Sequence, residues 1–137
     1  MPTYVADTHI YITAARDESF REAFARFIRR RGPLQVSAVV VAEVLLGVED
    51  ASRHAAVTLS LEAGSSIVAP TEGDWLTAAR AIAGLGGGAV TKGRSFWNDA
   101  LLAAQCARLG STLLTENEAD FRRLRTQIGV RTARPFP

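Results

Sequence analysis

The stretch RSFWNDALLAAQCARLGSTLLTENEADF, residues 94–121, decides how the rest of the chain is organised. It has the pattern of a helix, a turn, a short strand and the start of a second helix. Ser95 is a suitable N-cap, and residues 100–109 are rich in Ala and Leu on nearly every face, which predicts a buried helix. Gly110 fits the left-handed position that ends this helix, and a short apolar strand follows. Asp99 thus opens a buried helix, and further acids follow the strand to which the helix leads.

The composition is that of an ordinary globular protein. The chain has 137 residues, 47% hydrophobic and 22% charged, which suits one domain, residues 1–137, with a sizeable core. No apolar run approaches the ~20 residues of a membrane-crossing helix, and no basic segment followed by an apolar one opens the chain. We therefore expect a cytoplasmic protein that does not associate with membranes. The single cysteine, Cys106, excludes an intrachain disulfide and a zinc signature.

Arginine supplies nearly all of the positive charge, and the net charge is only +2. Guanidinium groups fit phosphate oxygens, which favours contact with a nucleic acid. Genomic base composition also replaces Lys by Arg throughout a proteome. A net charge this small leaves both interpretations open.

Short apolar segments alternate with helical ones, and this alternation predicts an α/β fold with a parallel sheet covered on both faces. The strand order does not follow from the pattern, but acids just after strands must share one edge of the sheet. Ser37, Ser52 and Thr71 are expected helix caps, and Trp75, Ala79 and Ile82 are expected to face the core. The expected strands are 3–6, 34–37, 66–69 and 111–115, with an edge strand near Val130. The expected helices are 8–14, 17–31, 42–48, 52–63, 71–85 and 95–109, and residues 121–124 extend a further short helix. The β-branched run that precedes residue 42 also suits a strand.

Two acids of the N-terminal half stand at or near strand ends. Asp7 follows the first strand, where it is either the N-cap of the next helix or a ligand at the carboxyl end of a strand. Glu43 lies among mostly aliphatic residues, and no basic residue on its helix can pair with it. Such a carboxylate needs a metal, another partner or water. The alternative is a narrow wet face shared with Gly47 and Asp50.

Asp7, Glu43, Asp99 and Asp120 occupy comparable places relative to the predicted strands. Carboxylate oxygens suit hard ions such as Mg²⁺ and Mn²⁺. Carboxylates gathered without a cation raise one another's pKa values, so a fold gains nothing from gathering them unless a cation is present. One or two such ions polarise a phosphodiester and lower the pKa of bound water. The two histidines belong to no recognisable nucleophile motif, which disfavours a Ser–His–Asp hydrolase.

Four segments resemble, in this order, the motifs of the PIN-domain family. They are DTHIYI at residues 7–12, SAVVVAEVLLG at 37–47, NDALLAA at 98–104 and TENEADF at 115–121. The resemblance is closest to the VapC-type toxins of bacterial toxin–antitoxin pairs and spans nearly the whole chain. It implies a three-layer α/β/α sandwich with a central parallel sheet. It also implies a Mg²⁺- or Mn²⁺-dependent endoribonuclease that leaves 5′-phosphate and 3′-hydroxyl ends.

The resemblance assigns roles to individual residues. The metal ligands and catalytic acids would be Asp7, Glu43, Asp99 and Asp120. The residues that support them would be Thr115, Asn117, Glu116 and His9. His9 stands where many members carry Asn, which leaves the support of the acids open but not the acids themselves. Independently of the resemblance, the basic residues that flank these motifs are candidate phosphate contacts: Arg94, Lys92, Arg122, Arg123 and Arg125.

The resemblance also implies partners. Such toxins bind a small VapB-like antitoxin whose C-terminal segment enters the site, often with an Arg among the acids, and they form homodimers. The amphipathic helices expected at 17–31 and 52–63 are candidate contact surfaces. Three alternatives stay open: a housekeeping RNA-processing nuclease of the same fold, a non-catalytic RNA-binding module, and an aspartyl-phosphate domain. The last is disfavoured because His9 stands where a second Asp is expected.

Overall fold

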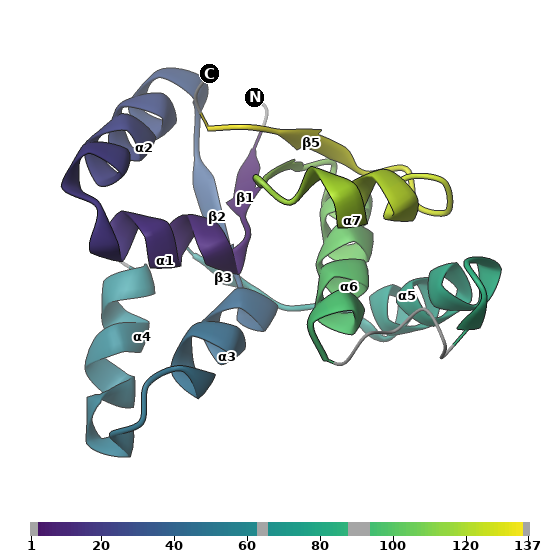
Figure 1. Cartoon of the computed structure of the whole chain (residues 1–137), viewed down its shortest axis with the longest axis horizontal. Helices are drawn as coiled ribbons and strands as arrows, with labels where there is room; N and C mark the ends of the chain where they lie inside the picture. The colour runs from purple at the N-terminus through teal and green to yellow at the C-terminus, as the bar shows by residue number, and fades with distance from the viewer. Residues whose placement is uncertain (1–2, 63–65, 88–93, 136–137) are drawn as a thin grey trace.

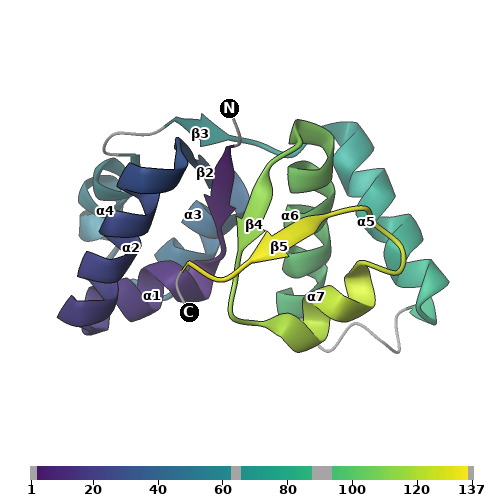
Figure 2. The same cartoon turned by 90° about the horizontal axis from the view of Figure 1, so that it is seen from above.

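A parallel sheet of five strands lies between two layers of helices in the computed structural model of the chain (Figures 1 and 2). The structure describes residues 3–62, 66–87 and 94–135. The strand order is β3-β2-β1-β4-β5, and all pairings are parallel. The strands are β1 Tyr4–Ala6, β2 Leu34–Ser37, β3 Ile67–Val68, β4 Thr112–Leu114 and β5 Arg131–Ala133. The α/β prediction with a parallel sheet is therefore confirmed, and the edge strand lies one residue beyond Val130.

The chain switches from one side of the sheet to the other at β1, although all strands remain parallel. From β1 the chain proceeds outward to β2 and β3 on one side, and β4 and β5 are added on the other side. In open α/β sheets, ligands bind in the crevice outside the carboxyl ends of the strands at such a switch point. Ala6 pairs with Leu114 in the β1–β4 register, so the residues that follow, Asp7 and Thr115, are neighbours in that crevice.

Helices connect the strands and cover both faces of the sheet (Figure 2). They are α1 Thr8–Arg16, α2 Glu18–Arg31, α3 Ala38–Leu46, a 3₁₀ turn η1 Ala51–Arg53, α4 His54–Glu62, α5 Glu72–Gly84, α6 Arg94–Leu109 and α7 Glu118–Leu124. No helix among the described residues is long and apolar enough to cross a bilayer.

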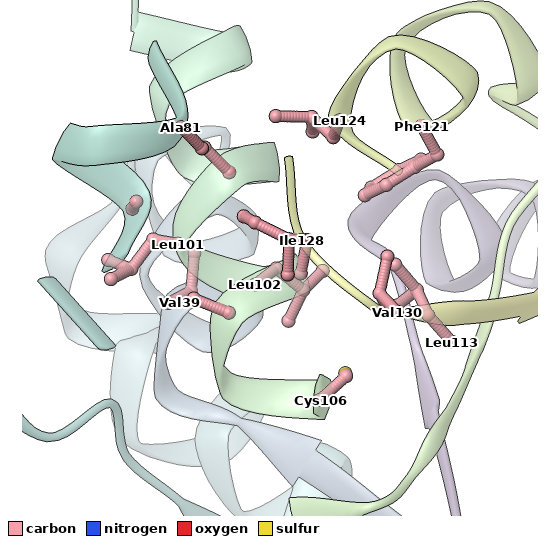
Figure 3. Close-up of a cluster of buried hydrophobic side chains, with 14 of the residues drawn as sticks. Val39, Ala81, Leu101, Leu102, Cys106, Leu113, Phe121, Leu124, Ile128 and Val130 are labelled. Atoms are coloured by element: carbon pink, nitrogen blue, oxygen red, sulfur yellow. The ribbon is translucent and has the colours of Figure 1, made fainter. Parts of the chain in front are cut away.

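Alternation along the central strands divides the core into two clusters. Val5 and Leu113 point into a large cluster with α3, α5, α6 and α7, part of which is seen in Figure 3. Their neighbours Ala6 and Leu114 point to the other face, where α1 and α2 cover them. The period of two residues is that of strands buried on both faces. Cys106 is fully buried in the larger cluster, as expected for a core residue.

Side-chain caps fix most of the predicted helix starts. Asp17 and Ser37 accept hydrogen bonds from the first turns of α2 and α3, and Thr71 forms a reciprocal capping box with Asp74 at α5. The prediction that Ser52 caps a helix is wrong, because Asp50 caps the 3₁₀ turn that precedes α4. Ser95 is likewise no cap, since α6 already begins at Arg94 and places Ser95 in its first turn.

The prediction that Trp75 and Ala79 face the core is also wrong. The buried face of α5 is formed by Asp74, Ala78, Ala81 and Ile82, and Trp75 remains 48% exposed. Asp74 takes this inward position because Arg108 of α6 pairs with both of its carboxylate oxygens at 3.0 Å. The buried face of α5 is therefore shifted by about one residue from the face that the apolar pattern predicted.

Candidate active site

Asp7 is held at the carboxyl end of β1 by hydrogen bonds to both carboxylate oxygens. Oδ1 accepts from the backbone N–H of Ile10 at 3.2 Å and so caps α1, and Oδ2 accepts from the Thr115 hydroxyl. The Asp7 backbone N–H donates to the Leu114 carbonyl at 3.0 Å, which ties the residue to β4. Asp7 is only 4% exposed. The cap interpretation of Asp7 is therefore correct, and it leaves Oδ2 directed toward the end of β4.

Glu43 reaches the same crevice from α3. Its Oε1 accepts a hydrogen bond from the Thr8 hydroxyl at 2.8 Å, across a sequence separation of 35 residues. Glu43 is half-buried, whereas Asp50 is exposed and caps the next turn. The alternative of a common wet face for these two acids is thus not what the structure shows.

Asp99 and Asp120 are joined by the amide of Asn117. The Nδ2 group of Asn117 lies 3.4 Å from Asp99 Oδ2 and 3.1 Å from Asp120 Oδ2. Asn117 also caps α7, since its Oδ1 accepts from the Asp120 N–H at 3.5 Å. Its own backbone N–H donates to Thr115 Oγ1 at 2.9 Å. One network therefore runs from Asp7 through Thr115 and Asn117 to Asp99 and Asp120.

The electrostatics of these acids are those of a crowded anionic site. Burial raises the pKa of Asp99 to about 8, and the charges of Asp7, Glu43 and Asp120 add to the shift. Burial also raises the pKa of Asp7, although the hydrogen bonds from Thr115 and Ile10 oppose it. Near neutral pH Asp99 thus keeps a proton that an isolated carboxylate would release.

Asp7, Glu43 and Asp99 line one cleft of about 200 Å³, which we call the acid cleft, together with Thr8, His9, Ile12, Ser95 and Asn117. Its lining contains no Lys or Arg side chain among the described residues. Asp7, Glu43 and Asp99 offer oxygen ligands, and the charges of Asp7 and Glu43 add to the burial that raises the pKa of Asp99, so these three residues fit a hard divalent ion. Within the described ranges, no three His, Cys, Asp or Glu side chains yet stand close enough together to hold one ion.

The other predicted site residues lie at different depths. Asp120 does not line the acid cleft, but it is linked to it by the hydrogen bond from Asn117 and by its charge, which adds to the pKa shift of Asp99. His9 is exposed and lines both the acid cleft and an adjoining hollow, to which Glu116 also contributes. Thr115 is fully buried beside Asp7.

None of the candidate phosphate contacts that the structure describes lines the acid cleft. Arg122 is exposed on α7, Arg123 stacks its guanidinium 4.9 Å from the centre of the Phe96 ring, and Arg125 lies 3.6 Å from Glu118. Lys92 lies outside the described residues, and Arg94 is placed only as the first residue of α6. Phosphate contact by these residues stays a prediction.

Sequence reasoning missed three cleft residues. Thr8 and Ile12 lie one and five positions after Asp7. Because Asp7 starts a helix, residues in the first turns of that helix could have been predicted to line the same cleft. Ser95 was interpreted as a cap, but it lies one helical turn before Asp99 and faces the same cleft.

Comparison with known proteins gives the same fold. The PIN-domain family model matches residues 4–126, and no curated relative matches significantly. A chain of VapBC-1 from nontypeable Haemophilus influenzae superposes with a TM-score of 0.75 at 18% identity, covering 97% of this chain and 98% of that one. A chain of VapBC2 from Rickettsia felis, bound to a promoter DNA fragment, gives 0.72 at 18% identity, with coverages of 96% and 98%. FitAcB from Neisseria gonorrhoeae gives 0.64 at 21% identity, with coverages of 96% and 97%.

At these identities the structural likeness establishes the fold alone. The family model adds sequence evidence over residues 4–126, a span that contains all four motifs and the acid cleft. The chain therefore belongs to the PIN-domain family.

Proposed function

We propose that the protein is a divalent-metal-dependent endoribonuclease and the toxin of a VapBC-type pair. The observation that carries the proposal is the convergence of Asp7, Glu43 and Asp99 on one cleft at the switch point of the sheet. PIN-domain nucleases generally use divalent ions, and the cleft has the oxygen donors and the unbalanced negative charge that such an ion relieves.

Asp7, Glu43 and Asp99 would hold Mg²⁺ or Mn²⁺, one ion or two, with Asp120 assisting from behind Asn117. Such an ion, when bound, supplies a Lewis acid for a phosphate oxygen and lowers the pKa of bound water. The chain's own groups orient the ligands, because the hydroxyls of Thr8 and Thr115 each hold one carboxylate oxygen.

Asn117 keeps Asp99 and Asp120 at a fixed separation through one amide group. Glu116 and His9 border the entrance, where they are placed to meet the RNA strand or a water. The expected products carry 5′-phosphate and 3′-hydroxyl ends.

Cleavage of mixed RNA with added Mg²⁺ or Mn²⁺ tests the proposal. Asp7→Asn and Asp99→Asn should lose at least a hundredfold in rate, because each removes a charged oxygen from the proposed ion. Asp50→Asn changes an exposed helix-capping acid and should retain full activity. Full activity of both cleft variants, or equal cleavage in excess EDTA, would refute the assignment.

We base the toxin interpretation on a groove that adjoins the acid cleft and could seat an antitoxin segment. A groove of about 640 Å³ runs between α1, α3 and α4, with Tyr11, Val44 and Leu61 among its lining residues. Arg16 and Arg21 also line it, and Ile12 is shared with the acid cleft. An antitoxin segment seated in this groove would reach the acids directly. The solved structures with this fold include VapBC and FitAB assemblies.

The cellular setting follows from the same proposal. The protein would act in the cytoplasm on RNA and form a homodimer that the antitoxin inhibits. Induction should stop growth unless the product of the neighbouring open reading frame is co-expressed, and gel filtration should show a complex of the two. Normal growth on induction, combined with metal-dependent RNA cleavage, would favour an RNA-processing nuclease of the same fold.

A further inference from the structure

A buried hydrogen bond joins the two helices that carry Glu43 and Asp99. The Ser37 hydroxyl donates to Gln105 Oε1 at 2.6 Å, across a sequence separation of 68 residues. Both residues are fully buried, and we call them the Ser37–Gln105 pair. Ser37 is the last residue of β2 and the N-cap of α3, whereas Gln105 lies inside α6. The pair therefore connects the start of one acid-bearing helix to the interior of the other.

This hydrogen bond is a directional contact in an otherwise apolar region. In the part of the chain that the structure describes, it is the one side-chain hydrogen bond between residues 34–46 and α6. Apolar side chains also join the two helices, since Val39 belongs to the same core cluster as Leu101 and Leu102 (Figure 3). Apolar packing has no preferred direction, whereas a hydrogen bond needs a short and well-aligned donor and acceptor. The pair thus restricts the relative position of α3 and α6 more closely than apolar packing does.

Gln105 also brings an unsatisfied donor into the core. Its Nε2 group is buried and has no hydrogen-bond partner among the described residues. A buried donor without a partner destabilises a fold, and an apolar side chain of the same shape would avoid this loss. Core stability alone therefore does not explain a glutamine at this position. The contact of its other amide atom with Ser37 offers an explanation.

Each acid lies six residues from the Ser37–Gln105 pair. Glu43 follows Ser37 by six positions along α3, and Asp99 precedes Gln105 by six positions along α6. At about 1.5 Å per residue, each acid is about 9 Å along its helix from the pair, so a rotation of about 10° there moves a carboxylate by about 1.5 Å. A small change at the pair is therefore large on the scale of a metal–ligand bond.

The pair links two parts of the site that other side chains leave separate. Asp99 belongs to the network that runs through Asn117, and within the described ranges that network does not include Glu43. Glu43 is instead held by the Thr8 hydroxyl of α1. We propose that the Ser37–Gln105 pair is a positioning element that sets the distance between Glu43 and Asp99, and with it the affinity of the acid cleft for a divalent ion. The inference rests on the proposed function.

Mn²⁺ affinity of the full chain, measured by calorimetry, tests the pair separately from cleavage. Gln105→Met keeps the length of the side chain and removes the acceptor of the Ser37 hydroxyl. The Kd for Mn²⁺ should rise about tenfold or more and kcat/KM should fall by a similar factor, because displacements of about 1 Å have effects of this size. The variant also loses the unpaired donor, so its Tm in EDTA should stay within about 5 °C of the wild type. A merely structural role predicts a lower Tm with an unchanged Kd.

Ser111→Ala is the matched control. The Ser111 hydroxyl shares a hydrogen bond of 2.7 Å with the Thr3 hydroxyl, which also joins distant segments, but it lies before β4 and does not line the acid cleft. This variant should lower Tm by a few degrees and leave both the Kd and cleavage unchanged. Ser37→Ala and the double variant with Gln105→Met complete a cycle. Because both changes break the same bond, the double variant should bind Mn²⁺ about as well as the weaker single variant.

The outcomes separate failure of the pair from failure of the nuclease function. An unchanged Kd in Gln105→Met, in a protein whose wild type binds Mn²⁺, would overturn the positioning role alone. So would a rise in Kd that Ser111→Ala reproduces, or effects of Ser37→Ala and Gln105→Met that simply multiply. Weaker Mn²⁺ binding by Gln105→Met, with no RNA cleavage by the wild type, would keep the positioning role and remove the nuclease proposal. A wild type that binds no Mn²⁺ would overturn both.

Discussion

Replacing Asp99 by Asn should make the metal-free protein more stable above pH 7 while abolishing cleavage. The structure raises the pKa of Asp99 from 3.8 to about 8, first through burial and then through Asp7, Glu43 and Asp120. Between these two values the folded protein keeps a proton that the unfolded chain has released. The free energy of unfolding therefore falls as pH rises from about 4 to about 8, and it levels off above the folded-state pKa. The Asn variant has the same shape, carries no charge at any pH and lacks this decline.

The size of the effect follows from the shift. At about 1.36 kcal/mol per unit, a displacement from 3.8 to about 8 corresponds to an upper limit of about 5–6 kcal/mol. Water on the open side of the cleft screens part of this, so we expect Asp99→Asn to gain about 2–3 kcal/mol at pH 8. For a domain of this size the gain amounts to a rise of roughly 6–12 °C in Tm.

Thermal and urea unfolding in EDTA, from pH 5 to 9, measure the difference between the two proteins. Asp50→Asn is the control, because hydrogen bonds from Ser52 lower the pKa of Asp50 below its usual value, so Asp50 is ionised throughout this pH range in both folded and unfolded chains. Its curve should follow that of the wild type. A wild-type stability that is flat from pH 5 to 8, or an Asp99→Asn variant less stable than wild type at pH 8, would refute the reasoning about a crowded site.

Three further outcomes follow from the same contacts. Mg²⁺ or Mn²⁺ at about 100 times its Kd should stabilise the wild type by about 2.7 kcal/mol and leave Asp7→Asn nearly unaffected, as unfolding with and without the ion will show. Thr115→Val removes the donor to Asp7 and the acceptor of the Asn117 N–H, and it should lower cleavage tenfold or more and stability by about 1–3 kcal/mol in urea. Asp74→Ala removes a capping box and the partner of Arg108, and it should cost about 2 kcal/mol of stability with unchanged kcat, since it lies away from the acid cleft.

The elements of the fold were largely readable from local chemistry. Caps such as Ser37 and Thr71 act within one turn of their own residue, so the sequence alone locates them. The same holds for the α6 helix, whose run from Ala100 to Cys106 is buried throughout. Strand order was not readable, because it depends on which strands pair across the sheet rather than on any local pattern.

The predictions that were wrong share one physical cause, because contacts between segments distant in the sequence decide these positions. Trp75 was assigned to the core by its apolar character, but the ion pair between Asp74 and Arg108, separated by 34 residues, selects a different face of α5. Ser95 was interpreted as a cap because its type suits that role, whereas its actual place is one turn inside the helix and on the cleft. A polar residue near a helix start is ambiguous until the partner of its side chain is known.

The site residues also divide into those that the sequence predicts and those that it does not. The motifs predicted which acids to gather, and the structure brings Asp7, Glu43 and Asp99 to one cleft. Only some of the neutral groups that hydrogen-bond the acids were predicted from the sequence. Thr115 and Asn117 were predicted from the family motif, whereas Thr8 was not.

All the hydrogen bonds that bind these carboxylates come from uncharged donors: hydroxyls, an amide and backbone N–H groups. Neutral donors fix the geometry of carboxylates but do not cancel their charge, so the charges of Asp7, Glu43 and Asp120 add to the burial that raises the pKa of Asp99 to about 8. No basic side chain lines the cleft among the described residues, so its electrostatic balance must come from outside this part of the chain. A divalent ion and a guanidinium from a bound partner are two solutions to the same deficit, and both need the same oxygens. If the proposed function holds, a partner that fills the cleft with a positive charge would inhibit by replacing the ion, with no conformational change required of this chain.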